Sequence, residues 1–131
     1  MQNQPSPDPG FIGLHHASLM VADVVVSTHF YCDVLGLEFD TNRPEMMFPG
    51  AWLNIGKSQQ IHLLQLPNPD PTEGRPTHGG RDRHTAMHVS DMDKLESRLK
   101  QADVPYTSSR SGRVAVFCRD PDGNALEFIQ V

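Results

Sequence analysis

Apolar and polar residues alternate along residues 13–21 of the 131-residue chain, and this pattern predicts a β-strand. The alternation places His16, Ser18 and Met20 on one face of that strand and leaves its apolar face for a helix. Apolar residues then recur at helical spacing, with Asp23 as the expected N-cap and Gly36 as the residue that ends the helix. The stripe expected to be buried consists of Val26, Phe30, Val34 and Leu35.

The same order of patterns returns in the second half of the chain. Residues 84–89 alternate with His84, Ala86 and His88 on one face, which predicts another strand. Asp91 is the expected N-cap of a second helix, whose apolar stripe contains Leu95 and Leu99. Further strands are predicted at residues 37–40, 51–55 and 60–66 in the first half and at residues 106–109, 114–118 and 125–130 in the second.

A short phrase opens each half: a His is followed five residues later by Val and seven residues later by Asp, first from His16 and again from His84. A repeat at about half the chain length indicates two copies of one small module rather than a solenoid. We therefore predict an α+β fold in which two βαβββ modules form a curved mixed sheet. The expected organisation is an N-terminal arm at residues 1–12 and a single domain at residues 13–131, with modules at 13–66 and 83–131 joined by a linker at 67–82.

The linker at residues 67–82 is rich in Pro and Gly, so its backbone is expected to be extended and irregular. A connection of this length inside a small domain is often a lid or a rim of a binding site. A plain solvated crossover between the modules is an equally good interpretation, and the sequence leaves both open.

Composition narrows the classes of partner. The formal net charge is −5 and no cluster of Lys and Arg forms a phosphate-binding face, which argues against nucleic acid. No apolar run is long enough to span a membrane, and the N-terminal arm lacks the features of a signal peptide. Two cysteines, Cys32 and Cys118, do not make a disulfide framework, so we expect a cytoplasmic protein with reduced thiols.

Four residues that can bind a metal fall on the predicted helix-free faces of four strands: His16, His62, His84 and Glu127. Each His taken alone is more often a hydrogen-bonded core or surface residue. Glu127 lies between Leu126 and Phe128, and a carboxylate buried there needs a cation as its partner. Imidazoles with one carboxylate suit a divalent ion such as Zn²⁺, Ni²⁺, Fe²⁺, Mn²⁺ or Co²⁺. His88 is expected to line the wall of the same site.

Several motifs together resemble the vicinal oxygen chelate superfamily, the group of glyoxalases, bleomycin-resistance proteins and extradiol dioxygenases. The similarity covers about residues 13–131, and its most specific part is the segment from Asp120 to Glu127. The motifs are Leu14-His15-His16, Phe30-Tyr31-x-x-Val34-Leu35-Gly36-Leu37-Glu38, Ile61-His62-Leu63, Arg83-His84-Thr85-Ala86 and Asp120-Pro121-Asp122-Gly123-Asn124-x-Leu126-Glu127.

The resemblance implies a divalent metal held by His16, His62, His84 and Glu127, and chelation of two adjacent oxygens of a small-molecule substrate. In the leading interpretation the protein is a glyoxalase-like lyase or isomerase, in which His62 or Glu127 moves a proton beside the chelated carbonyl. The resemblance also implies a homodimer, which is expected because two modules leave open sheet edges that a second copy can cover.

Two other functions stay open. Met20, Leu66 and His62 stand where glyoxalase I has two glutathione-gripping residues and a metal-binding Glu. His16, His84 and Glu127 match the two-His, one-carboxylate set of an Fe²⁺-dependent extradiol dioxygenase, with His62 as its acid or base. A non-enzymatic binding protein of the bleomycin-resistance kind would instead use an aromatic groove, for which Trp52 and Phe117 are available.

Overall fold

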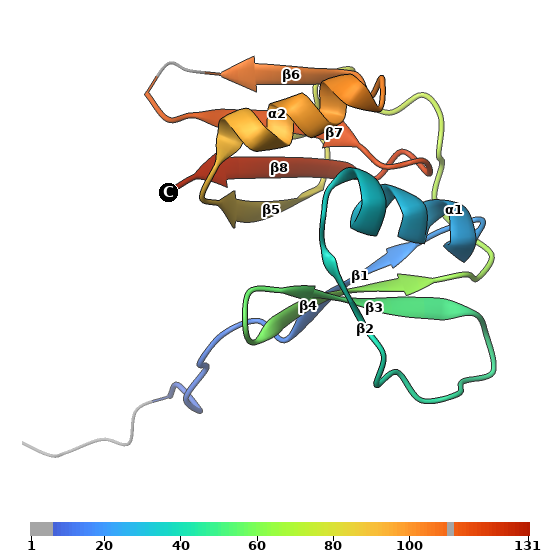
Figure 1. The fold of residues 1–131 in the computed structure, drawn as a ribbon. Helices are drawn as coiled ribbons and strands as arrows, with labels where there is room; N and C mark the ends of the chain where they lie inside the picture. The colour runs from blue at the N-terminus through green and yellow to red at the C-terminus, as the bar shows by residue number, and fades with distance from the viewer. Residues whose placement is uncertain (1–6, 110–111) are drawn as a thin grey trace, which may run out of the picture.

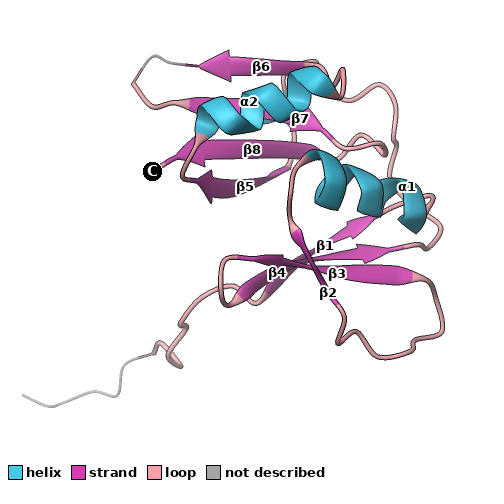
Figure 2. Ribbon diagram, in the orientation of Figure 1, coloured by secondary structure: helices cyan, strands magenta, loops and turns pink. Residues whose placement is uncertain are grey.

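The computed structural model describes residues 7–109 and 112–131 and shows the predicted α+β architecture of two βαβββ modules (Figures 1 and 2). The elements in chain order are β1 (His16–Met20), α1 (Val24–Thr28), the π-helical segment η1 (His29–Val34), β2 (Glu38–Asp40), β3 (Gly50–Ile55), β4 (Gln59–Leu64), the 3-10 turn η2 (Gly79–Arg81), β5 (His84–Val89), α2 (Met92–Gln101), β6 (Tyr106–Ser109), β7 (Ala115–Arg119) and β8 (Ala125–Gln130).

The strands form two four-stranded mixed sheets with the same topology, in the orders β1-β4-β3-β2 and β5-β8-β7-β6. In each sheet the first strand pairs parallel with the last strand of its module, and the other pairings are antiparallel. The predicted repeat is therefore confirmed at the level of strand pairing. The sequence predicted one curved sheet, whereas the structure has two sheets, with β1 and β5 as edge strands.

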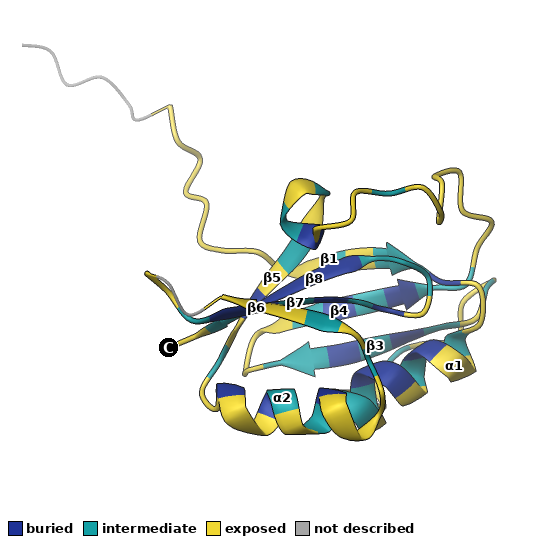
Figure 3. Cartoon of the chain, turned by 90° about the horizontal axis from the view of Figure 1, so that it is seen from above, coloured by how far each residue is buried: buried dark blue, intermediate teal, exposed yellow. Residues whose placement is uncertain are grey.

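Both helices lie on the same side of the sheets, and this side holds the core (Figure 3). Ile61 and Leu63 of β4 and Leu126 and Phe128 of β8 point to that side and are at most 3% exposed. Alternation along the strands then sends the residues between them, His62 and Glu127, to the opposite face, which carries only the 3-10 turn η2 and neither α1 nor α2, and which is called the helix-free face below. No helix in the described ranges is long and apolar enough to cross a bilayer.

The first helix begins as predicted but buries a different stripe. Asp23 caps α1 by accepting hydrogen bonds from the N–H groups of Val25 and Val26, and Gly36, with a φ of 91°, lies just beyond the end of η1, which continues α1. Val26 is 50% exposed, so its predicted burial is wrong. The buried residues are Ser27, Phe30 and Tyr31.

Two physical causes explain this difference. Ser27 can be buried because its hydroxyl donates a hydrogen bond to Asp122 across the module junction (3.3 Å). The chain also widens from α1 into the π-helical η1, so the 3.6-residue period used for the prediction does not continue past His29. Phe30 and Tyr31 thereby both face the core, with their rings in edge contact at 5.2 Å.

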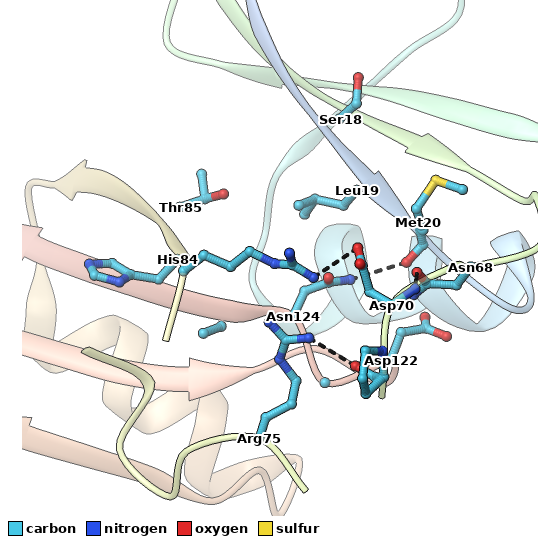
Figure 4. A pocket seen from close by; sticks show the side chains of 14 residues that line it. Ser18, Leu19, Met20, Asn68, Asp70, Arg75, His84, Thr85, Asp122 and Asn124 are labelled. Carbon is cyan, nitrogen blue, oxygen red and sulfur yellow. Dashed lines mark hydrogen bonds and ion pairs between the residues drawn. The ribbon is translucent and has the colours of Figure 1, made fainter. Parts of the chain in front are cut away.

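The turn at residues 120–124 joins the second module to the first. Asp120 shapes the turn by accepting hydrogen bonds from the backbone N–H groups of Asp122 and Asn124. Besides the bond from Ser27 to Asp122, three hydrogen bonds join the turn to the first module: Tyr31 Oη to Asp120 Oδ2 (2.7 Å), the Ala22 N–H to Asp122 Oδ1 (2.8 Å) and Asn124 Nδ2 to the Met20 carbonyl (3.1 Å), the last visible in Figure 4. Burial raises the pKa of Tyr31 well above its ordinary value, so its hydroxyl remains a donor.

Replacing Tyr31 by Phe should lower the free energy of unfolding by about 1.5–3 kcal/mol, the usual range for a hydrogen bond to a charged group. The buried Asp120 loses one donor while the packing of the ring is kept. Chemical denaturation of wild type and Tyr31→Phe measures the difference. Tyr106→Phe is the matched control, because Tyr106 takes no part in this network, and its effect should stay within about 0.5 kcal/mol. Equal losses in both variants would contradict the junction role of Tyr31.

Candidate metal centre

On the first sheet, two of the predicted ligands lie side by side. The imidazole rings of His16 on β1 and His62 on β4 are stacked, with their centroids 3.8 Å apart and their planes 11° from parallel. Trp52 on β3 stacks on the other face of His62 at 4.7 Å. Both faces of the His62 ring are therefore covered, and only its edge, where the two nitrogens lie, can make new contacts.

Electrostatics keep His62 neutral. Burial is the largest cause, followed by the nearby His16, His15 and Arg43, and together they lower the pKa of His62 to about 4. A neutral imidazole retains a nitrogen lone pair, which is the form that binds a metal or takes up a proton. His62 is therefore ready for either role at neutral pH.

On the second sheet, His84 of β5 and Glu127 of β8 form the other pair. Glu127 is only 3% exposed. Its Oε1 lies 3.1 Å from Nε2 of His84, and its Oε2 accepts a hydrogen bond from Arg113 (2.7 Å). The ring of Phe117, which is opposite Glu127 in the β7–β8 register, makes an edge contact with His84. The buried carboxylate thus has the cationic partner that the sequence pattern required, although that partner is an arginine.

The end of the linker orients His84. Nδ1 of His84 lies 2.8 Å from the backbone carbonyl of Asp82, which can only accept, so Nδ1 carries the hydrogen. The Asp82 carboxylate is itself held by Arg75 and Arg119, and these arginines keep the pKa of Asp82 well below its usual range. The end of the linker at residues 67–82 is thus held in place beside His84.

The contact between His84 and Glu127 has a chemical consequence. Nε2 of His84 faces the lone pairs of Glu127 Oε1, and when Nδ1 alone carries a hydrogen it turns a lone pair of its own toward them. Two acceptors 3.1 Å apart repel each other unless a proton or a metal ion lies between them. Metal–ligand bonds of about 2.1 Å at tetrahedral or octahedral angles place neighbouring ligand atoms about 3.0–3.4 Å apart. This pair therefore fits a divalent cation.

All four predicted ligands lie on the helix-free faces of their sheets, but within one chain they form two pairs rather than one cluster. Residues 7–109 and 112–131 contain no group of three or more His, Cys, Asp or Glu side chains arranged to hold a metal ion. The first pair is His16 with His62, and the second is His84 with Glu127. The donor set suits a borderline divalent ion, and each pair supplies half of it.

Two cavities lie where β1 faces β5. One, of about 210 Å³, is bounded by β1, the linker and the 120–124 turn and contains His84 (Figure 4). The other, of about 390 Å³, contains His16, Gln60 and His88, so His88 lines a cavity beside His16 and not the one that contains His84. Each cavity reaches only one of the two pairs, in agreement with the division of the ligands.

Sequence reasoning missed several residues that touch the pairs, among them His15, whose Nδ1 lies 2.8 Å from Nδ1 of His16. The side-chain oxygen of Gln60 accepts a hydrogen bond from Nε2 of His62 (2.8 Å), and the position of Gln60 two residues before His62 on the same face could have revealed it. Asp82 likewise stands two residues before the histidine that its backbone carbonyl contacts, His84, and the same spacing could have revealed it. Arg113 precedes β7 and carries no periodic signal, so only the need of the buried Glu127 for a cation could have pointed to it.

Comparisons with known proteins show which protein family the chain is similar to. A sequence model of the Glyoxalase/Bleomycin resistance protein/Dioxygenase superfamily matches residues 13–128. Glyoxylase I 4 of Arabidopsis thaliana is 32% identical over 120 residues, which cover 87% of this chain and 68% of that protein. A lactoylglutathione lyase of Neisseria meningitidis is 30% identical over 124 residues, 89% of each. The crystal structure of a glyoxalase/dioxygenase from Nostoc punctiforme, 21% identical, matches the fold with a TM-score of 0.74 over 98% of both chains.

In the metal-free protein, His62 should titrate near pH 4, whereas an ordinary His titrates near 6.5. Imidazole C–H signals followed by NMR between pH 8 and about 3 measure this midpoint. The unfolded chain takes up a proton on this residue at a higher pH than the folded chain does, so His62 should lower the stability as the pH falls from about 6.5 to about 4. In His16→Ala the midpoint should move upward, because a cause of the shift is removed. A wild-type midpoint near 6.5 would contradict this environment.

Proposed function

The chain belongs to the Glyoxalase/Bleomycin resistance protein/Dioxygenase superfamily, and on this basis we propose that it is a metal-dependent lyase or isomerase of the glyoxalase kind. The proposed substrate is a small molecule with two adjacent oxygens that bind one divalent cation. The observation that carries the proposal is the approach of His84 Nε2 to Oε1 of the buried Glu127, a nitrogen and an oxygen at a distance that a divalent cation between them would satisfy, as would a proton.

In this proposal His16, His62, His84 and Glu127 hold a divalent metal. When bound, such a metal polarises a carbonyl and stabilises the negative charge that develops beside it. Glu127 is the only carboxylate among the four, so it neutralises more of the positive charge of the metal ion than any of the three histidines does. Trp52 covers one ring face of His62, and Phe117 makes an edge contact with His84.

Between the two residues proposed to move the substrate proton, the geometry favours His62. Both oxygens of Glu127 are engaged, one beside His84 and the other by Arg113. His62 is neutral at pH 7 and has one nitrogen hydrogen-bonded, to Gln60. A general base needs a free lone pair within reach of the proton that it takes. The one free nitrogen of His62 cannot bind the metal and take up the proton at the same time, so we assign the base to His62 in the state in which this nitrogen is off the metal, and the charge-bearing ligand role to Glu127.

A homodimer would complete the site. Each chain offers one half on each sheet, and the halves do not meet within the described part of one chain. A twofold axis would place the His16/His62 pair of one subunit opposite the His84/Glu127 pair of its partner and would create two identical sites. The edge strands β1 and β5 at the junction offer unpaired backbone groups that such an interface can shield.

A second candidate, an Fe²⁺-dependent ring-cleaving dioxygenase, is favoured by one specific observation. Aromatic rings stand against the histidines, with Trp52 stacked on His62 and Phe117 in contact with His84, and such surfaces suit a planar diol. Oxygen consumption with a catechol, dependent on Fe²⁺, would select this chemistry over the lyase.

Replacing Glu127 by Gln keeps the side-chain size but removes the negative charge. Metal affinity should fall by about tenfold or more, since even the loss of an outer hydrogen-bond partner has effects of that size. Metal per chain after dialysis, measured by elemental analysis, should be near stoichiometric in wild type and much lower in Glu127→Gln. Glu45→Gln, at an exposed loop position, is the matched control and should keep its metal. Equal metal in all three proteins would refute the assigned site.

Mixing two inactive variants tests whether the site is shared between subunits. His16→Ala damages one half and His84→Ala the other, so each homodimer has two damaged sites. After subunit exchange at equal amounts, about a quarter of the sites should contain all four ligands, because half of the dimers are mixed and each has one intact site. Bound metal should recover to that fraction. Light scattering should give a dimer at micromolar concentration. A dimer without recovery would place each site within one chain, and a monomer would refute the shared site.

A further inference from the structure

A hydrogen-bonded row crosses the helix-free face of the first sheet and ends at His62. Glu38, Asn54 and Gln60 are direct partners in the β2–β3–β4 register. Asn54 donates from Nδ2 to Glu38 (3.1 Å), which leaves its Oδ1 as an acceptor. Gln60 donates from Nε2 to that oxygen (2.8 Å) and to Asp40 (2.7 Å). Both hydrogens of the Gln60 amide are thus used.

These contacts settle the orientation of the Gln60 amide. If it were turned over, its oxygen would face the Asp40 carboxylate and the Asn54 oxygen at hydrogen-bond distance, and three acceptors would repel one another. The carbonyl oxygen of Gln60 therefore points to Nε2 of His62, 2.8 Å away. A carbonyl oxygen only accepts, so this nitrogen of His62 must carry the hydrogen.

The other nitrogen of His62 is left with its lone pair. No hydrogen bond reaches Nδ1 from residues 7–109 or 112–131, and the ring faces are covered by His16 and Trp52. Stacking prevents the ring from tilting, and the bond to Gln60 prevents it from turning over. A single nitrogen in a fixed direction is what a metal site or a general base requires.

We propose that Gln60, held by Asp40 and Asn54, is a positioning residue that locks neutral His62 in the tautomer with hydrogen on Nε2 and leaves Nδ1 as the nitrogen offered to the site. The use of Nδ1 toward a cation or a substrate proton rests on the proposed function, whereas the tautomer itself does not. His84 has the opposite arrangement, because the Asp82 carbonyl fixes its hydrogen on Nδ1. The two halves of the site would then present different imidazole nitrogens.

Nitrogen-15 NMR of metal-free protein with labelled histidines tests the tautomer. At pH 7 the His62 signals, assigned by their absence in His62→Gln, should show a protonated Nε2 whose hydrogen exchanges slowly with water, and an unprotonated Nδ1. In Gln60→Leu that hydrogen should exchange quickly and both tautomers should be populated. Gln59→Leu, at the exposed neighbouring position of β4, is the matched control and should resemble wild type. A protonated Nδ1 in wild type, or a Gln60→Leu spectrum identical to wild type, would overturn the proposal.

A second variant and a metal titration make the test independent of folding and of the proposed function. Asp40→Asn keeps the side-chain shape but lets position 40 donate, so the Gln60 amide can turn over and the Nδ1–H tautomer should appear. Zn²⁺ added to wild type should perturb the Nδ1 signal of His62 while Nε2 keeps its hydrogen. Zn²⁺ on Nε2 would overturn the inference. If Zn²⁺ does not bind at all, the proposed function fails, and the metal-free spectra still decide the tautomer.

Discussion

The arrangement of the two modules depends on the hydrogen bond from Tyr31 to Asp120 and on the turn that Asp120 shapes. Tyr31 lies in the core of the first module, and Asp120 begins the turn between β7 and β8 of the second. Because both groups are buried, neither can exchange its partner for water, so the junction has one favourable geometry. Neighbouring residues of the same turn bind the backbone just after β1 and at its end. The strands that carry His16 and Glu127 therefore have fixed positions relative to each other.

Charge is distributed unequally between the two halves of the site. The first half is made of two closely stacked imidazole rings. The second half contains a buried carboxylate between a histidine and an arginine. Bringing them together would combine imidazole donors with a single anion, a composition that leaves a net positive charge on a bound divalent ion. That charge is what would attract an anionic oxygen of a substrate.

The sequence predicted the repeat, the order of the elements and the placement of the four ligands on the helix-free faces. It could do so because apolar and polar residues alternate with a period of two in a strand that buries one face in the core, and this pattern is a strong signal. The sequence pattern predicted the wrong buried residue in the first helix, Val26 in place of Ser27. Burial of a serine depends on a hydrogen-bond partner, which here lies in the other module, and the π-helical turn changes the spacing of the buried residues. Arg113 and the Gln60–Asp40 contact were not predicted for a related reason. They depend on how side chains from different strands meet, and periodicity along one strand does not contain that information. The division of the ligands into two pairs likewise follows from how the two sheets are placed, which no local pattern encodes.

Trp52 is the only tryptophan in the chain, and its indole is stacked on the His62 imidazole at 4.7 Å. Tryptophan emission is sensitive to the protonation and ligation of a ring in direct contact with it. The protein therefore contains an optical reporter placed within one half of the candidate site. Events at His62 can be followed by intrinsic fluorescence, without a label and without knowledge of the substrate.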